Sequence, residues 1–433
     1  MKFKGILTRC LILSLVFVLT PAVALADEEK DTGFEGWDEE TEGDTKPKDG
    51  EDKETKTGDT ATETKTTAPP VVKDSSKIKE EPRVGLDAKH PGGQEGLLPS
   101  VHTRYGSLAL MGLFQTLFSS AMVNDNSAAS ETVGFTFQRA RIILKGHLLT
   151  ENLEYFFQGD AVNMASFALD MYVKYKYRGF SIRFGRFVPD FTYMLPRNKG
   201  DLAAVEHPIY LTFGAFGVWR QIGAEMGYQV SDELELKFGV FNGLMYEPNF
   251  INPLLVNMQM GVIEVGGATY NNYTDNNKAK DFMLRASYQV NRHLSLDLNF
   301  WLGMPVNSTG DEDNDIVIIG GPGAEFNNGK LHLISEFMFR VVSYGHDIDA
   351  VTSLALWAHA GYRFTDLIEG IFRVDWVEPN LDADDDMRLR LTTGAHLWIE
   401  EKHFRIMSNV FIELPLPDGN EIFGILIQAA LTW

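Results

Sequence analysis

Residues 170–177 decide the fold, because two kinds of side chain alternate along them. The segment reads Asp170-Met171-Tyr172-Val173-Lys174-Tyr175-Lys176-Tyr177, with largely charged even positions and Met, Val or Tyr at the odd ones. Successive side chains of a β-strand point to opposite faces, so this period of two predicts a strand with one polar and one apolar face. The same alternation recurs at 294–300, 330–340 and 423–433. The sequence therefore predicts an all-β fold.

The connections between these strands alternate in length. Tight turns are expected at 150–152, 178–179, 231–232, 291–292, 327–329, 365–366 and 400–401. Longer polar loops, between the turns, include 117–132, 188–216, 243–278, 304–314, 343–349, 380–386 and 415–420. Seven turns and eight loops give sixteen strands, and this pattern is typical of a transmembrane antiparallel β-barrel. An even number of strands places both ends of the barrel on the short-turn, periplasmic side.

A secreted β-sandwich or β-helix is the competing interpretation of the strands. Sandwich strands are typically about five or six residues long, whereas these run to about ten or more, the length that crosses a bilayer at a tilt. No short repeat indicates a β-helix. The weakest strand is 315–327, where Gly320-Gly321-Pro322-Gly323 includes a proline that cannot donate to the ladder, so the count of sixteen depends on it.

Composition divides the chain into three segments. Residues 1–26 read as a secretory signal peptide, with a basic start, an apolar core at Leu11–Leu19 and a small-residue cleavage pattern at Ala24-Leu25-Ala26. Residues 27–97 hold 11 basic and 21 acidic residues with few large apolar ones, so we expect a disordered acidic tail. Residues 98–433 are the expected barrel. The only cysteine, Cys10, lies in the signal, which excludes a disulfide scaffold in the mature chain.

The formal net charge of −21 argues against nucleic-acid binding, which needs a basic face. No pattern indicates a cofactor or a metal site. The acidic cluster between Asp382 and Asp386 could bind Ca²⁺, but its spacing matches no defined calcium loop, and a solvated loop is the preferred interpretation.

Lipid cannot solvate charge, so the charged face of each strand must line the lumen. Counting outward from the short turns places many charged side chains there. The basic ones are Arg139, Arg141, Lys145, His147, Lys174, Lys176, Arg183, Arg285, Arg340, Arg363, Arg373, Arg388, Arg390 and Arg405. The acidic ones include Glu154, Asp160, Asp170, Glu225, Asp297, Glu336, Glu369 and Asp375. Such a wall around a sixteen-stranded barrel predicts a water-filled channel with mild attraction for anions. Alternatively, each arginine pairs with a facing carboxylate and only stiffens the wall.

The loop at 188–216 is long enough to fold back into the pore, where Arg197 and Lys199 would meet every passing solute. The alternative is a loop lying on the extracellular rim. The candidate pore-lining, anion-contacting residues are thus Arg139, Arg141, Lys174, Arg183, Arg197 and Lys199.

Several motifs resemble those of the phosphate-selective porin O and P family. They are Phe137-Gln138-Arg139-Ala140-Arg141 with Leu153–Asp160, Asp170–Tyr175 with Ser181–Pro189, and Arg220-Gln221-Ile222-Gly223 with Phe238–Gly243. The resemblance covers roughly 135–243 and implies a sixteen-stranded, usually trimeric outer-membrane channel. It also implies that Trp433 is the terminal aromatic read by the barrel-insertion machinery. Phosphate-selective members carry a denser ladder of basic residues, whereas 98–433 here holds 25 basic and 39 acidic residues.

The predicted function is an outer-membrane porin for passive diffusion of small hydrophilic solutes, with phosphate among the candidate anions. Its expected partners are membrane lipid, lipopolysaccharide and two further copies of itself. A barrel enzyme would need a Ser and a His held together on a lipid-facing wall, and the scattered histidines single out no nucleophile, so we expect no enzyme. A structural anchor, whose acidic tail tethers a periplasmic partner, stays open. Deleting 27–97 would support it if partners were lost while conductance stayed unchanged.

Overall fold

The computed structural model describes the barrel and part of the segment before it. The described residues are 83–85, 100–124, 130–162, 167–197, 202–211, 216–243, 279–305, 315–343, 350–383, 386–400, 403–416 and 421–433. They belong to the compact unit that includes Pro82–Trp433. The signal peptide at 1–26 lies outside the described residues, as does all of the tail at 27–97 except 83–85. Both therefore stay predictions.

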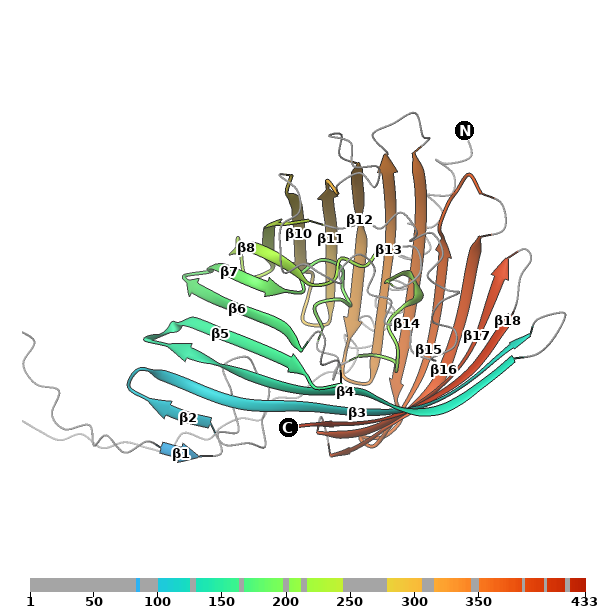
Figure 1. The fold of residues 1–433 in the computed structure, drawn as a ribbon, viewed down its shortest axis with the longest axis horizontal. Helices are drawn as coiled ribbons and strands as arrows, with labels where there is room; N and C mark the ends of the chain where they lie inside the picture. The colour runs from blue at the N-terminus through green and yellow to red at the C-terminus, as the bar shows by residue number, and fades with distance from the viewer. Residues whose placement is uncertain are drawn as a thin grey trace, which may run out of the picture. The chain divides into compact units, whose positions relative to one another are not determined.

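Sixteen strands form a closed ring. The first eight are β3 (Gly106–Asn124), β4 (Ser130–Leu148), β5 (Thr150–Asp160), β6 (Ala168–Tyr177), β7 (Phe180–Phe187), β8 (Gln221–Gln229), β9 (Leu234–Phe241) and β10 (Asp281–Gln289). The others are β11 (Leu294–Gly303), β12 (Ile316–Asn327), β13 (Leu331–Ser343), β14 (Val351–Arg363), β15 (Ile368–Glu378), β16 (Met387–Glu400), β17 (Phe404–Leu416) and β18 (Glu421–Thr432). Each strand pairs antiparallel with the next, and β18 pairs with β3 (Figure 1). The predicted sixteen-stranded antiparallel barrel is confirmed.

Two short strands precede the barrel. β2 (Ser100–Thr103) forms a hairpin with the first residues of β3, and β1 (Arg83–Gly85) pairs with β2. A short 3₁₀ turn, η3 (Ile209–Leu211), lies in the connection between β7 and β8. Among the described residues, no helix is long and apolar enough to span a membrane.

Five tight turns lie where the sequence predicts them, at 178–179, 231–232, 291–292, 327–329 and 365–366. The prediction at 150–152 is wrong, because those residues belong to β5 and the chain turns at Leu149. The turn predicted at 400–401 falls partly outside the described residues. At the turn between β6 and β7, Arg178 and Gly179 have φ of 45° and 71°, the double positive φ of a two-residue type I′ hairpin. Both ends of the barrel sequence reach the rim of the barrel that the tight turns form. Leu149 in the first tight turn donates its N–H to the Tyr105 carbonyl at 2.7 Å, and Thr432 donates to the carbonyl of His403 in the last turn at 2.7 Å.

The loop predicted at 117–132 is shorter than expected. β3 continues to Asn124 and β4 begins at Ser130, because the alternation persists through small polar residues. Leu117 and Ser119 are buried inside, whereas Phe118 is only half-buried and contacts the Phe135 ring at a centroid distance of 5.0 Å. Serine does not end a strand when its neighbours keep the period of two.

The strand with the proline does form. β12 pairs fully with β11, but its pairing with β13 skips Gly321 and Pro322, so the missing proline N–H interrupts only one side of the ladder. A Cβ atom at Gly321 would stand 1.8 Å from the Phe337 carbonyl oxygen. The β13 backbone therefore approaches so closely that only glycine fits there.

We expect Gly321→Ala to destabilise the barrel by about 1–3 kcal/mol, because the Cβ must displace backbone rather than a flexible side chain. The urea midpoint of unfolding in detergent measures this effect. Gly329→Ala is the matched control, since no atom lies within 4 Å of the Cβ position there, although its φ of +87° adds local strain. Equal losses in the two variants would contradict the close-approach explanation.

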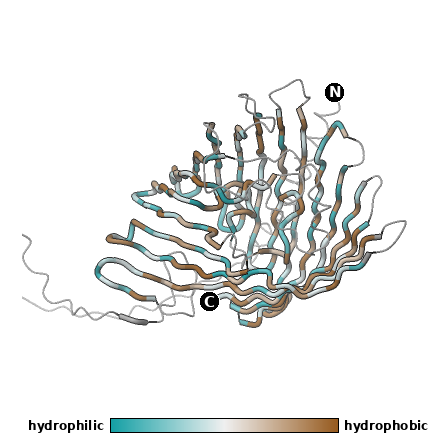
Figure 2. The backbone as a smooth tube through the Cα atoms, in the orientation of Figure 1, coloured by the Kyte–Doolittle hydropathy of each residue, from teal (hydrophilic) through white to brown (hydrophobic). Residues whose placement is uncertain are grey.

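The two faces of the wall differ as predicted. Phe135 and Phe137 are exposed, at 83% and 63%, whereas Arg139, Arg141 and other charged residues of the spanning strands are buried. Hydrophilic and hydrophobic residues alternate along these strands (Figure 2). A β-bulge near Gln138 lets Phe137 face outward and Arg139 inward, although both have odd numbers.

Candidate functional site

The long connection between β7 and β8 folds into the barrel, where Figure 1 shows it as the green segments inside the wall. Phe191, Tyr210 and Phe216 from this connection are fully buried. They pack in one apolar cluster with inward-facing residues of β9 to β15, among them Trp301 and Trp357. We call residues 188–220 the inner loop. The expectation of a polar wall on every side is corrected here, because the wall is apolar where the inner loop covers it.

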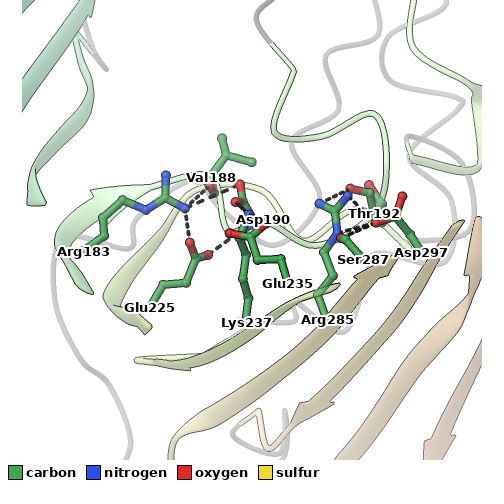
Figure 3. Close-up of polar contacts among 10 residues, drawn as sticks. All are labelled: Arg183, Val188, Asp190, Thr192, Glu225, Glu235, Lys237, Arg285, Ser287 and Asp297. Carbon is green, nitrogen blue, oxygen red and sulfur yellow. Dashed lines mark hydrogen bonds and ion pairs between the residues drawn. The ribbon is translucent and has the colours of Figure 1, made fainter. Parts of the chain in front are cut away.

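Charged groups hold the start of the inner loop against β7, β8 and β9 (Figure 3). The Asp190 carboxylate lies 2.6 Å from Lys237 Nζ and 3.7 Å from Arg183 Nη2, and Arg183 also pairs with Glu225 at 2.7 Å. The Asp190 N–H donates to Glu225 at 2.9 Å. Burial raises the pKa of Asp190, but Lys237 and Arg183 outweigh it and hold that pKa well below its usual range. The Asp190 carboxylate therefore stays ionised, and its ion pairs with Lys237 and Arg183 persist into acidic solution.

A buried carboxylate on β13 holds the middle of the inner loop. Glu336, 0% exposed, accepts hydrogen bonds from the Tyr193 N–H at 2.8 Å, the Tyr210 hydroxyl at 2.5 Å and Trp357 Nε1 at 3.1 Å. Burial and the nearby Glu336 raise the pKa of Tyr210 well above its ordinary value, so the phenol remains a donor. Two loop groups and one wall group thus converge on one carboxylate.

The rest of the inner loop is fastened to the far wall. Arg390 on β16 pairs with Glu206 at 3.0 Å, and Arg373 on β15 donates to the Glu206 carbonyl at 2.7 Å. The Val205 N–H donates to Asn409 on β17 at 2.8 Å. The inner loop therefore contacts the wall from β7 to β17, and Val205 also packs with Leu117 on β3 and Leu426 on β18. Between the inner loop and strands β3 to β7 a space remains.

A cavity of about 240 Å³ lies in that space. Its wall consists of Met111, Arg141, Ile143, Lys145, Phe156, Gln158, Asp170, Tyr172, Arg183 and Phe187 from the barrel, Val188, Leu195, Pro196 and Arg197 from the inner loop, and Arg220 just before β8. Five of these side chains are cationic and one is a carboxylate. The cavity is basic although the chain as a whole is acidic.

Most of the cavity's cations are already paired. Each arginine contacts a carboxylate: Arg141 with Asp160 at 3.0 Å, Arg183 with Glu225 at 2.7 Å, Arg197 with Glu325 at 2.8 Å and Arg220 with Asp170 at 3.0 Å. Lys145, by contrast, makes no ion pair with any residue that the structure describes. Lys145 is thus the cavity cation without an ion-pair partner among the described residues, and the charge of Glu154 acts on it from beyond ion-pair distance.

The structure brings three of the six candidate residues into this cavity, namely Arg141, Arg183 and Arg197. Lys174 is next to them, directly opposite Arg183 in the register of β6 and β7, but it does not line the cavity. Arg139 does not line the cavity either; its side chain is buried and donates a hydrogen bond to Gln115 at 2.8 Å. Lys199 lies outside the described residues. The alternative interpretation, in which each arginine pairs with a carboxylate, holds for the three candidates in the cavity, Arg141, Arg183 and Arg197.

Sequence reasoning did not name several cavity residues as site residues, among them Lys145, Phe156, Asp170, Tyr172 and Arg220. Lys145 and Asp170 were placed in the lumen but not in the site, and Phe156 and Tyr172 were not considered for it. Lys145, Phe156 and Tyr172 are register neighbours on β4, β5 and β6. The register shifts between His147 and Leu148, so a regular count from the Leu148–Thr150 pair would align Lys145 with Leu153 instead of Phe156. Among the described residues, no group of three or more His, Cys, Asp or Glu side chains could hold a metal ion.

Three solved structures with this architecture are distant in sequence from this chain. The anion-selective porin from Comamonas acidovorans matches with a TM-score of 0.56 at 13% identity, covering 76% of this chain and 100% of that one. The outer-membrane channel DcaP of Acinetobacter baumannii matches with a TM-score of 0.52 at 8% identity, covering 76% and 98%. The trimer form of OmpT, an outer membrane protein of Vibrio cholerae, matches with a TM-score of 0.50 at 11% identity, covering 76% and 100%. These likenesses show the fold.

No curated protein sequence matches the chain. The family model described as phosphate-selective porin O and P matches residues 112–370, from β3 into β15. Family and fold together point to an outer-membrane channel rather than an enzyme. Because the match spans more than half of the 433 residues, the chain belongs to the phosphate-selective porin O and P family.

Proposed function

We propose that this porin passes small hydrophilic solutes passively and favours anions, phosphate among them, at the basic cavity. The observation that carries the proposal is the basic cavity between the inner loop and strands β3 to β7, which Lys145 and the paired arginines line. Fixed positive charge in a narrow, low-dielectric passage raises the local concentration of anions. The proposed anion-contacting set is Arg139, Arg141, Lys174, Arg183, Arg197 and Lys199, of which Arg141, Arg183 and Arg197 line the cavity. To this set we add Lys145, which lines the cavity and makes no ion pair with a described residue.

Two further parts of the proposal concern assembly and topology. The trimer form of the Vibrio cholerae OmpT structure supports a homotrimer. Both ends of the barrel sequence lie at the short-turn rim, which is the periplasmic side in outer-membrane barrels, and this supports a periplasmic position for residues 27–97. Membrane lipid and lipopolysaccharide are the surroundings that such a barrel meets.

The reversal potential of the purified protein in a planar bilayer under a KCl gradient tests the anion preference. We expect anion selectivity, and block of the chloride current by micromolar to millimolar phosphate, because Lys145 acts where the path is narrow. Cation selectivity without block would mean that the acidic loops dominate and the protein is a general porin. A folded protein without conductance would favour the anchor.

A further inference from the structure

The cavity combines its charge with an aromatic surface. Phe156 stacks on Tyr172 with ring centroids 5.1 Å apart and an interplanar angle of 11°. Tyr172 in turn meets Phe187 edge-on at 5.8 Å. Three rings from β5, β6 and β7 therefore form one side of the passage. Gly185, the register partner of Tyr172, lets the two strands approach closely, since a Cβ atom there would stand 2.2 Å from the Met171 carbonyl oxygen.

Arginine side chains extend the aromatic surface. The Arg183 guanidinium lies 3.9 Å from the Phe187 ring centroid and 5.2 Å from that of Tyr172. Because Arg183 also pairs with Glu225, its charge is largely compensated, and it serves here as a flat, weakly hydrated continuation of the rings. The apolar side chains of Met111, Ile143 and Leu195 line the same cavity.

Lys145, which has no ion-pair partner among the described residues, stands directly beside these rings. Lys145 is the register partner of Phe156, which is itself the partner of Tyr172. An inorganic anion would gain attraction from Lys145 but nothing from the rings. An anion that carries a flat apolar group would gain both, because ring stacking and apolar burial add to the charge interaction. The size is sufficient, since a buried apolar cavity of about 150 Å³ already holds benzene.

We propose that the cavity is a subsite for aromatic carboxylates, with the carboxylate at Lys145 and the ring against Phe156 and Tyr172. This inference rests on the proposed anion channel and names its preferred class of organic solute. It assigns Phe156, which carries no charge, a role in selecting among anions.

Block of the chloride current tests the subsite in the full-length protein. Benzoate and acetate share a carboxylate and differ in the ring, so their half-blocking concentrations are compared in the same bilayer. We expect benzoate to block at a clearly lower concentration than acetate. Phe156→Leu should raise the half-blocking concentration of benzoate roughly two- to tenfold and leave that of acetate unchanged, because only the stacked ring is lost. Lys145→Gln should weaken block by both anions.

Phe157→Leu is the matched control. The Phe157 side chain lies on the opposite face of β5, where its ring packs against Phe167 with a centroid distance of 6.3 Å. This variant should leave both anions unaffected. A chloride-selective channel that phosphate blocks, but in which benzoate blocks no better than acetate, would overturn the subsite alone. An unchanged benzoate block in Phe156→Leu would do the same. A channel without anion selectivity would overturn the proposed function and the subsite together.

Discussion

Replacing residues 192–216 with a short Gly-Ser linker is expected to raise the single-channel conductance roughly two- to fivefold and to abolish phosphate block. The inner loop places Tyr210 and Phe216 fully inside the barrel and is bonded to Glu336 on the wall. Without it, a sixteen-stranded barrel has a wide aqueous lumen, and the charges of Arg141 and Lys145 act across a much larger cross-section. Single-channel recording at fixed KCl concentration measures the change.

A second variant keeps this prediction testable if the deletion exposes too much of the apolar wall to fold. Glu336→Ala retains all residues of the inner loop but removes the hydrogen-bond acceptor for Tyr193, Tyr210 and Trp357. We expect a noisier channel with excursions to higher conductance, because three donors lose their partner. Glu336→Gln keeps acceptor oxygen and serves as the control. Steady, unchanged conductance in both the deletion and Glu336→Ala would show that the narrowest part of the path lies elsewhere.

Charge reversal at Lys145 should have the second largest effect. Lys145→Glu changes the charge beside the path by two units, which amounts to about 1–2 kcal/mol at a distance of several ångströms in a partly aqueous passage. The chloride-to-potassium permeability ratio should therefore fall about tenfold. The reversal potential under a KCl gradient measures it.

Lys176→Glu makes the same charge change on the lumenal face of β6, near its turn. Lys176 is exposed and already paired with Glu154 at 2.7 Å, so we expect a much smaller shift. A large shift for Lys176→Glu and none for Lys145→Glu would place the selectivity at the periplasmic mouth rather than at the cavity.

The wall could be predicted from sequence because its physics is local. Lipid outside and water inside impose a period of two, so segment 170–177 reveals its faces without knowledge of its neighbours. Counting from tight turns placed Arg141 and Arg183 in the lumen, and both line the cavity. The count succeeds only as far as the pairing is regular, and the bulge near Gln138 has no signature in residue type.

The inner loop and its contacts could not be predicted in the same way. Segment 188–216 has no period, and its length alone suggested an inward fold. The pair Arg197–Glu325 and the contact of Tyr210 with Glu336 join positions more than a hundred residues apart, so they depend on the register of the whole barrel. For the same reason, Phe156 looked like an ordinary strand residue until Lys145 and Tyr172 were aligned beside it.

The seam between β3 and β18 sets the order of assembly. The Gly112 N–H donates to the Trp433 carbonyl at 2.9 Å, and Trp433 donates back to Gly112 at 3.1 Å, so the last residue of the chain completes the pairing of the first barrel strand. Contacts of such high sequence separation form slowly, because the chain between them must be ordered before they can close. A nascent chain that lacks β18 would present two open edges, each a template for mispairing. The barrel can therefore close only once β18 is available to pair with β3.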